Sequence, residues 1–306
     1  MKKTLSFLLI LLLIFSSVIS YADTTVKMNQ DSETFKYKIS AESNEWKSFN
    51  SHDEMVQACR IPSNVVSKMT TEELVDAVLS YPLLYDVHFF NKTEDAIEQL
   101  KQNSDAFYEL INRKDAARIL LGSIKNAESS LQEKTIKLLL EEENLSKHIY
   151  NTDDVGILSS TATVYTPNGS AVSVIIYGEE YTQQEKDEFD NYTKAQYPKA
   201  TFVSSSTTNY NCHSYAWYSS STTNKYWMNN PSKYMTDGSY IEKSSPMSAT
   251  HMYYSSGDHS AKIYDATSNV KGNATVISKW GPGPVMIHKA SYSPYSSVNL
   301  SVWSRN

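Results

Sequence analysis

Between residues 50 and 145, apolar residues recur at the spacing of amphipathic helices. Thr70 with Glu73, and Ser51 with Glu54, have the capping-box pattern that opens a helix. Asn91 is placed to cap a third helix, with apolar residues at 96, 97 and 100. Further helices are expected over 107–124 and 127–145, and the acidic run at 141–143 is interpreted as a solvated face of the last one. The pattern predicts an all-helical domain over residues 50–155.

In the second half of the chain, the pattern changes to that of β-strands. Residues 161–165 and 171–177 are two β-prone runs, and the Asn-Gly pair at 168–169 between them indicates a hairpin. Thr182 with Glu185 opens a helix to residue 196. Further strands are expected at 200–204, 260–264, 274–279 and 285–288. This order predicts an α+β domain with an antiparallel sheet over residues 160–306.

The composition shifts where the pattern does. Residues 23–160 carry 24 acidic and 15 basic residues, whereas residues 161–306 carry 10 and 11. Sixteen of the 22 tyrosines and four of the five tryptophans lie in the second part. The shift predicts a domain boundary near 155–162, with residues 23–49 as a polar lead-in. The overall charge of −6 argues against nucleic acid as a partner, because phosphate binding needs a basic surface.

The amino terminus has the pattern of a secretory signal peptide. Lys2 and Lys3 precede an apolar run that ends at Ile19, and Ser20-Tyr21-Ala22 provides a cleavage site after residue 22. The alternative is an uncleaved anchor, which needs about 20 apolar residues. No later segment is apolar enough to span a bilayer. We therefore expect a bacterial protein that is secreted, extracellular or associated with the cell wall, with no stable membrane span after cleavage.

One of the two cysteines lies in a pattern that suggests chemistry. Two cysteines exclude a disulfide-rich scaffold and an all-cysteine metal centre, and no cofactor is expected. Asn211 is a good helix N-cap, which places Cys212 in the first turn of a helix. The unpaired N–H groups there favour a thiolate over a thiol. A thiolate is the nucleophile of cysteine hydrolases.

A cysteine nucleophile needs a base, and this half of the chain offers His213, His251, His259 and His288. His259 follows a Ser-Gly-Asp turn and enters a predicted strand, so its ring can face a helix terminus. His213 adjoins Cys212 but is expected about 100° away around the helix, which makes it a poor base. His251 and His288 remain possible.

Two short motifs resemble a known family. The stretch Asn-Cys-His-Ser-Tyr-Ala-Trp at 211–217, followed by Gly-Asp-His-Ser-Ala at 257–261, resembles the CHAP amidohydrolases and peptidases and, more broadly, the NlpC-type cell-wall peptidases. The resemblance implies a papain-like fold in which Cys212 is the nucleophile and His259 the base. A polar residue on the next strand orients the histidine in that family, and Ser278 and Asn273 are the candidates. Residues 50–145 resemble exported bacterial proteins of unassigned function.

The resemblance implies amide hydrolysis through a thioester acyl-enzyme. The backbone N–H of Cys212 would form part of the oxyanion hole, with Asn209 or Asn211 as a side-chain donor. Trp217 and Trp280 are the candidate substrate contacts. Peptidoglycan peptides are the expected substrate, and exported proteins are the second choice.

Other interpretations of the same residues stay open. Cys212 and Cys59 can form a disulfide in an exported protein, or Cys212 can be an inert buried thiol. A metal site has candidate ligands in His251, Asp258, His259 and His288, although their spacing matches no known pattern. The alternative to an enzyme is a non-catalytic surface or cell-wall binding protein that retains the fold.

Overall fold

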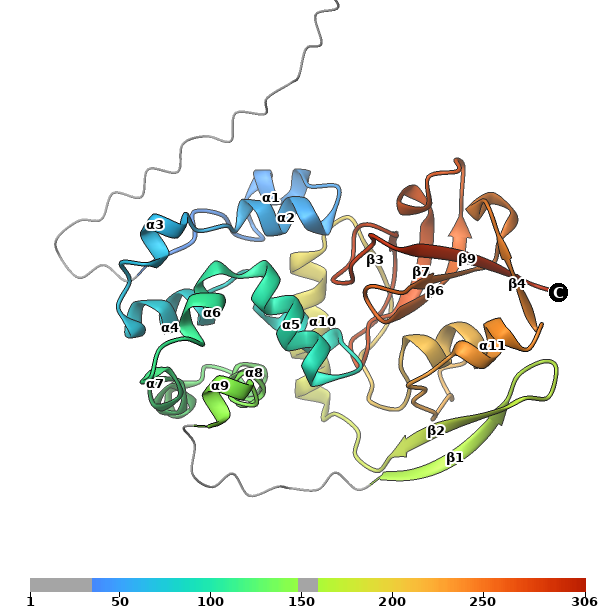
Figure 1. The fold of residues 1–306 in the computed structure, drawn as a ribbon, viewed down its shortest axis with the longest axis horizontal. Helices are drawn as coiled ribbons and strands as arrows, with labels where there is room; N and C mark the ends of the chain where they lie inside the picture. Colours follow the sequence, from blue (N-terminus) through green and yellow to red (C-terminus); the bar gives the residue numbers. More distant parts are fainter. Residues whose placement is uncertain (1–34, 148–158) are drawn as a thin grey trace, which may run out of the picture. The chain divides into compact units, whose positions relative to one another are not determined.

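The computed structural model describes residues 35–147 and 159–306. The predicted signal peptide lies outside these residues, as does most of the expected boundary near 155–162. Within them the chain is mixed α/β with antiparallel sheets, as the sequence predicts (Figure 1). None of the helices in these two ranges is long and apolar enough to cross a membrane.

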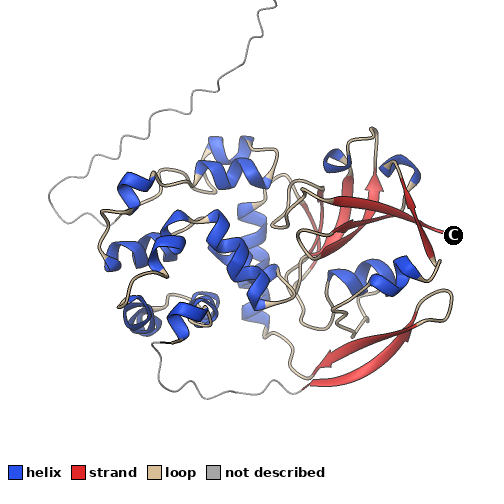
Figure 2. Cartoon of the chain, viewed as in Figure 1, coloured by secondary structure: helices blue, strands red, loops and turns tan. Residues whose placement is uncertain are grey.

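Short helices make up most of the first described range (Figure 2). They are α1 (Asn44–Ser48), α2 (His52–Ala58), α3 (Ser63–Val66), α4 (Thr71–Leu79), η1 (Leu84–Phe89), α5 (Thr93–Asn103), α6 (Asp105–Leu110), α7 (Ala116–Ser123), η2 (Ile124–Asn126), α8 (Ser130–Leu139) and α9 (Glu143–Ser146). The capping box of Thr70 and Glu73 is present at the start of α4. Ser51 caps α2 as predicted, but the Glu54 carboxylate accepts from the backbone N–H of Asn50.

Three local predictions in the helical region are wrong. Asn91 does not cap α5, because the N-cap position belongs to Lys92. The helix predicted over 127–145 is two helices, α8 and α9. The acidic run between them is not wholly solvated, since the Glu142 side chain is buried, accepts from the backbone N–H of Asn144 and pairs with Lys101 Nζ at 2.8 Å. The Glu142 carboxylate is thus a hydrogen-bond acceptor for backbone N–H groups at the start of α9, which have no partner within the helix.

The end of the predicted polar lead-in is part of the fold. Trp46 in α1 has no exposed surface, and its indole N–H donates to the carbonyl of Gln196 at 2.8 Å. Ile39 is also buried. A five-residue helix with one buried side chain has no periodic pattern, so the sequence gives no signal for it.

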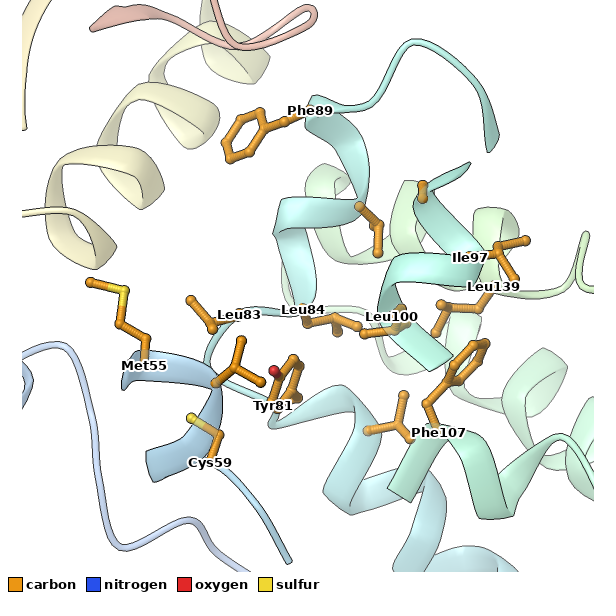
Figure 3. Packing of buried hydrophobic residues seen from close by; sticks show 14 of the residues in the cluster. Met55, Cys59, Tyr81, Leu83, Leu84, Phe89, Ile97, Leu100, Phe107 and Leu139 are labelled. Atoms are coloured by element: carbon orange, nitrogen blue, oxygen red, sulfur yellow. The ribbon is translucent and has the colours of Figure 1, made fainter. Parts of the chain in front are cut away.

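One large hydrophobic cluster joins the helices to one face of the sheet. Figure 3 shows its helical part, where side chains from α2, α5, α6 and α8 converge. Cys59 lies in this cluster, and burial raises the pKa of its thiol to about 12. The described residues of both ranges belong to one compact unit. The predicted division into a helical and a papain-like domain stays a prediction, because both parts share one hydrophobic core.

The hairpin and the following helix agree with the sequence prediction. Strands β1 (Ser159–Tyr165) and β2 (Ala171–Tyr177) pair antiparallel, and Gly169 in their turn has φ of 86°. A positive φ is the conformation that glycine adopts without steric cost. The helix α10 (Gln183–Gln196) begins with the predicted capping box of Thr182 and Glu185.

A seven-stranded antiparallel sheet follows, in the order β3-β8-β7-β6-β5-β9-β4. Its strands are β3 (Thr201–Ser204), β4 (Tyr240–Lys243), β5 (His251–Tyr254), β6 (His259–Asp265), β7 (Thr275–Lys279), β8 (Val285–Lys289) and β9 (Leu300–Arg305). The short helices η3 (Ser214–Tyr218), α11 (Ser232–Thr236), η4 (Pro246–Ser248) and η5 (Lys271–Asn273) lie between them. The sequence predicts β3, β6, β7 and β8 but not β4, β5 and β9.

The two faces of this sheet have different neighbours. Ala261 of β6 pairs with Met252 of β5, and both belong to the cluster shared with the helices. Ser260 points to the opposite face, because successive side chains of a strand alternate. There it accepts a hydrogen bond from the indole N–H of Trp217 in η3. The helix that follows Cys212 therefore packs against the Ser260 face.

Candidate functional site

Cys212 begins a short helix, as the sequence predicts. Asn211 caps it, since its Oδ1 accepts from the backbone N–H of Ser214 at 3.1 Å. The helix continues as the π-helical turn η3, in which the N–H of Ser219 donates to the carbonyl of Ser214. Such turns are rare and recur at functional sites.

The thiol of Cys212 is free and fully buried. Cys59 is also a free thiol, so the alternative of a disulfide between the two is wrong. The side-chain amide of Asn91 is a hydrogen-bond donor to the sulfur, with its Nδ2 3.5 Å from Sγ, and the His213 side chain also interacts with Cys212. Asn91 comes from the connection between η1 and α5, 121 residues earlier in the chain.

Asn91 binds four groups of the site. Its Nδ2 donates to the backbone carbonyl of Asp258 at 2.9 Å and lies 3.3 Å from His213 Nε2. Its Oδ1 accepts from Asn211 Nδ2 at 3.0 Å. The amide therefore links the cysteine helix to the turn that precedes β6.

His213 lies in this site, paired with Asp258. Its Nε2 is 3.3 Å from Asp258 Oδ1, and its Nδ1 is 2.8 Å from Ser260 Oγ. Burial lowers the pKa of His213, but the neighbouring Cys212 and Asp258 outweigh it and raise the pKa to about 9. Burial likewise acts to raise the pKa of Asp258, but His213 and Lys92 hold it below its usual range. The site thus contains an imidazolium–carboxylate pair at neutral pH.

His259 starts β6 as expected, but its ring has no hydrogen-bond partner. Both nitrogens are buried and unpaired. The ring stacks on Tyr295 with centroids 3.6 Å apart and meets the edge of Tyr254. Burial and the neighbouring His288 and His213 hold its pKa well below the ordinary value, so the ring is neutral at pH 7.

The two candidates for orienting His259 are engaged elsewhere. Ser278 Oγ lies 2.8 Å from Nε2 of His288, not beside His259. Asn273 is exposed in η5. Ser278 Oγ also accepts from the indole N–H of Trp280 at 3.2 Å, and it makes no hydrogen bond to His259.

The predicted oxyanion and substrate residues are mostly structural. Both amide atoms of Asn211 bind neighbouring groups, and Asn209 donates to Glu180 at 2.7 Å. Trp217 and Trp280 are buried and bind Ser260 and His288. Neither tryptophan ring is exposed to a substrate, and the half-buried Asn209 already has one amide hydrogen on Glu180.

The four candidate metal ligands do not meet. His251 Nε2 faces the carbonyl of Ala216 at 2.8 Å, and His288 binds Ser278. The part of the chain that the structure describes contains no group of three ligand-type side chains able to hold a metal ion.

Close packing on Phe89 brings Asn91 to the site. The hydroxyl of Tyr295 donates to the Phe89 carbonyl at 2.7 Å. A Cβ on Gly281 would collide with that carbonyl, and one on Gly283 would collide with the Phe89 ring. Lys279 is fully buried and donates to the carbonyls of Gly281 and Gly283, which fixes this loop. Burial lowers the pKa of Lys279 to about 7.

The sequence predicts Cys212 and His259 as site residues but not Asn91 or His213. Asn91 has the local signature of a helix cap, and its role depends on a contact far along the chain. The sequence makes His213 a poor base because neighbours on a helix do not share a face, but in the structure its side chain interacts with Cys212. The amide of Asn91 nevertheless reaches both side chains.

In comparisons with known proteins, no family model, curated protein or solved structure matches this chain.

Proposed function

We propose that the protein is an exported cysteine amidohydrolase or peptidase with Cys212 as nucleophile and His259 as base. The observation that carries the proposal is the environment of the sulfur. An amide N–H donates to it, and the charged pair of His213 and Asp258 lies beside it. His259, whose ring nitrogens have no hydrogen-bond partner, directly follows Asp258 in the chain. The short motifs around Cys212 and His259, which resemble the CHAP family, give the same two roles.

The unpaired nitrogens of His259 support its role as base. A buried polar group without a partner costs about 1–3 kcal/mol, so its presence calls for an explanation. A general base needs a free lone pair, and a neutral imidazole has one. The ring of His259 lies on the Ala261 face of β6, whereas the Cys212 helix packs on the Ser260 face, so the ring must turn toward the sulfur to accept its proton. His213 already binds Ser260 and Asp258 and is protonated, so it is suited to stabilise a nearby negative charge.

The proposed reaction has two steps. The sulfur of Cys212 attacks the amide carbonyl while its proton goes to His259, and the tetrahedral intermediate collapses to a thioester. The amine leaves with the proton from His259. Water then attacks the thioester, giving its proton to His259, and the carboxylic acid leaves as the thiol is restored. Neither Cys212 nor His259 has exposed surface, so a substrate must displace the side chains above them.

The substrate proposal follows from the predicted signal peptide. Outside a bacterial cell, the peptides of peptidoglycan are the abundant amide substrate, with exported proteins as the second class. No cofactor enters the proposed reaction. Association with the cell wall or release to the medium are both compatible with this substrate.

A second candidate function is a non-catalytic binding protein that keeps the fold. The full burial of Cys212 and the absence of a hydrogen bond that orients His259 favour it. In this case, the side chains of the site would only fill the space between the helix and the sheet.

A hydrolysis assay separates the two candidates. The mature chain is incubated with purified peptidoglycan, and with an unfolded protein as the alternative substrate, while new amino groups are labelled and counted. We expect their release to be lost in Cys212→Ser and in His259→Ala. Cys59→Ser is the matched control and should retain release, because Cys59 lies in the hydrophobic core. Equal yields of amino groups from the wild type and Cys212→Ser on both substrates would exclude catalysis.

A further inference from the structure

We propose that Asn91, supplied by the helical region, is a further residue of the site, whose side-chain amide binds the Cys212 sulfur as a thiolate. The proposal rests on the proposed function in that it concerns the same nucleophile. It also gives the helical region a role that its sequence does not indicate. That region would contribute the side-chain amide of Asn91 to the site.

The orientation of the amide follows from its neighbours. Two backbone N–H groups, of Ser214 and Met228, donate to Asn211 Oδ1, so Nδ2 of Asn211 is its donor end. That donor end faces Asn91 at 3.0 Å, which makes the facing atom the oxygen of Asn91. The other end of Asn91 faces the carbonyl of Asp258 and must be the nitrogen.

This orientation points an N–H group at the sulfur. With one hydrogen on the Asp258 carbonyl, the second points to Sγ at 3.5 Å, because His213 Nε2, 3.3 Å away, carries its own proton and cannot accept it. A hydrogen bond to a charged acceptor is roughly twice as strong as one to a neutral acceptor. The amide therefore binds the thiolate more strongly than the thiol.

The charges around the sulfur act in both directions, since the His213 imidazolium favours a thiolate and the Asp258 carboxylate opposes it. The titratable groups that interact with Cys212 are His213 in its own helix, Tyr253 on β5, Lys279 on β7 and Tyr295 after β8. Asp258 is the nearby carboxylate, and it is paired with His213 and with Lys92 Nζ at 3.6 Å. The paired carboxylate opposes a thiolate less than a free one would.

The position of Asn91 is fixed from both sides. The carbonyl of Phe89, two residues before it, accepts a hydrogen bond from the Tyr295 hydroxyl, and Phe89 packs closely against Gly281 and Gly283. Lys92, one residue after it, pairs with Asp258. The segment between η1 and α5 therefore presents the amide to Cys212 from a fixed backbone.

The test measures the ionisation of Cys212 directly. The ultraviolet absorbance of the thiolate is followed against pH, and the curve of Cys212→Ser is subtracted in each background. Asn91→Leu keeps the size of the side chain and removes the N–H donor. Asn91→Asp keeps the acceptor for Asn211 and places a carboxylate at the sulfur. Asn112→Ala changes an exposed asparagine of the helical region and is the matched control.

We expect the ionisation midpoint to rise by about one pH unit in Asn91→Leu and further in Asn91→Asp. Asn112→Ala should leave it unchanged. Asn91→Asp also adds a carboxylate that repels the thiolate, so the rise in Asn91→Leu carries the test, and Asn91→Ala replaces it if Asn91→Leu does not fold. An unchanged midpoint in the folded variant that lacks the donor would overturn the proposal.

Alkylation and hydrolysis separate this inference from its alternatives. If Asn91 only covers the sulfur, its variants will alkylate faster at high pH with no shift of the midpoint, which would also overturn the proposal. If no amide is hydrolysed but the midpoint shifts, the proposed function fails while the assignment of Asn91 stands. If hydrolysis requires Cys212 but Asn91→Leu leaves both its rate and the midpoint unchanged, only the assignment fails.

Discussion

The molecule contains two buried polar clusters that differ in how completely their atoms are paired. In the helical region, Asp86 accepts hydrogen bonds from Tyr192 at 2.9 Å and Tyr197 at 2.5 Å and lies 3.1 Å from His52 Nε2. These residues join α2, η1 and α10. None of the fully buried side-chain nitrogen and oxygen atoms of this cluster is without a hydrogen-bond partner, and the cluster has the properties of a structural joint.

The cluster around Cys212 is buried to a similar degree, yet it leaves atoms unpaired. Of the six histidines in the described residues, only His259 has no hydrogen bond. Natural proteins seldom retain such a cost without a use for the free atoms. The comparison teaches that unpaired groups distinguish the candidate site better than burial or polarity does.

The largest expected effect concerns the Asp86 cluster. Asp86→Ala leaves His52 and two tyrosine hydroxyls without a partner, which should lower the free energy of unfolding by about 3 kcal/mol or more. Urea denaturation measures this loss. Asp53→Ala, an exposed aspartate of α2, is the matched control and should change stability by under about 0.5 kcal/mol. A loss below 1 kcal/mol for Asp86→Ala would refute the view of this cluster as a structural joint.

The next effect is a dependence of stability on pH through His213. Its pKa of about 9 in the folded protein exceeds the ordinary value of 6.5, so protonation stabilises the fold fully below pH 6.5. This contribution, at most about 3 kcal/mol, is lost as the pH rises through 9. Urea denaturation at a series of pH values should show the loss in the wild type and not in His213→Gln.

His251 provides the control for this pH dependence. Burial lowers its pKa to about 4, so its contribution is present above pH 6.5 and is lost as the pH falls toward 4. His251→Gln should therefore retain the alkaline loss that His213→Gln removes. An equal loss of stability at alkaline pH in His213→Gln would contradict the assignment to His213.

The smallest predicted effect is an increase in stability on mutation. His259→Phe replaces an unpaired imidazole by an apolar ring that can stack on Tyr295, so stability should rise by about 1 kcal/mol while hydrolysis is lost. His52→Phe is the contrasting change and should destabilise, because it removes a partner of Asp86. Thermal unfolding of both variants measures the difference. Destabilisation of His259→Phe by more than 1 kcal/mol would give His259 a structural role.

Much of the fold follows from local signals. The Asn-Gly turn, the capping boxes at Thr70 and Thr182, and the cap at Asn211 each act within a few residues, and all are present. Strand β5 has only four residues and no polar alternation, with His251 and Met252 both buried. It forms because β6 and β9 pair with it on both sides, which no local pattern records.

The site divides in the same way. Cys212 and His259 stand out because their neighbours in sequence place them at the start of a helix and of a strand. The role of Asn91 has no local signal, since asparagine before Lys-Thr-Glu has the composition of a cap. The partners of Ser278 and Trp280 are likewise decided by register across β7 and β8, which puts Ser278 opposite Met286 and near His288.

The packing of Phe89 against Gly281 and Gly283 has a consequence for the order of assembly. During synthesis, the helices leave the ribosome before the glycines that receive Phe89 have been made. Until then the Phe89 ring has no permanent neighbour on that side, so the amide two residues later is not yet held at the Cys212 sulfur. The surroundings of Cys212 thus become complete only when nearly the whole chain has been synthesised, so a growing chain would carry no finished nucleophile.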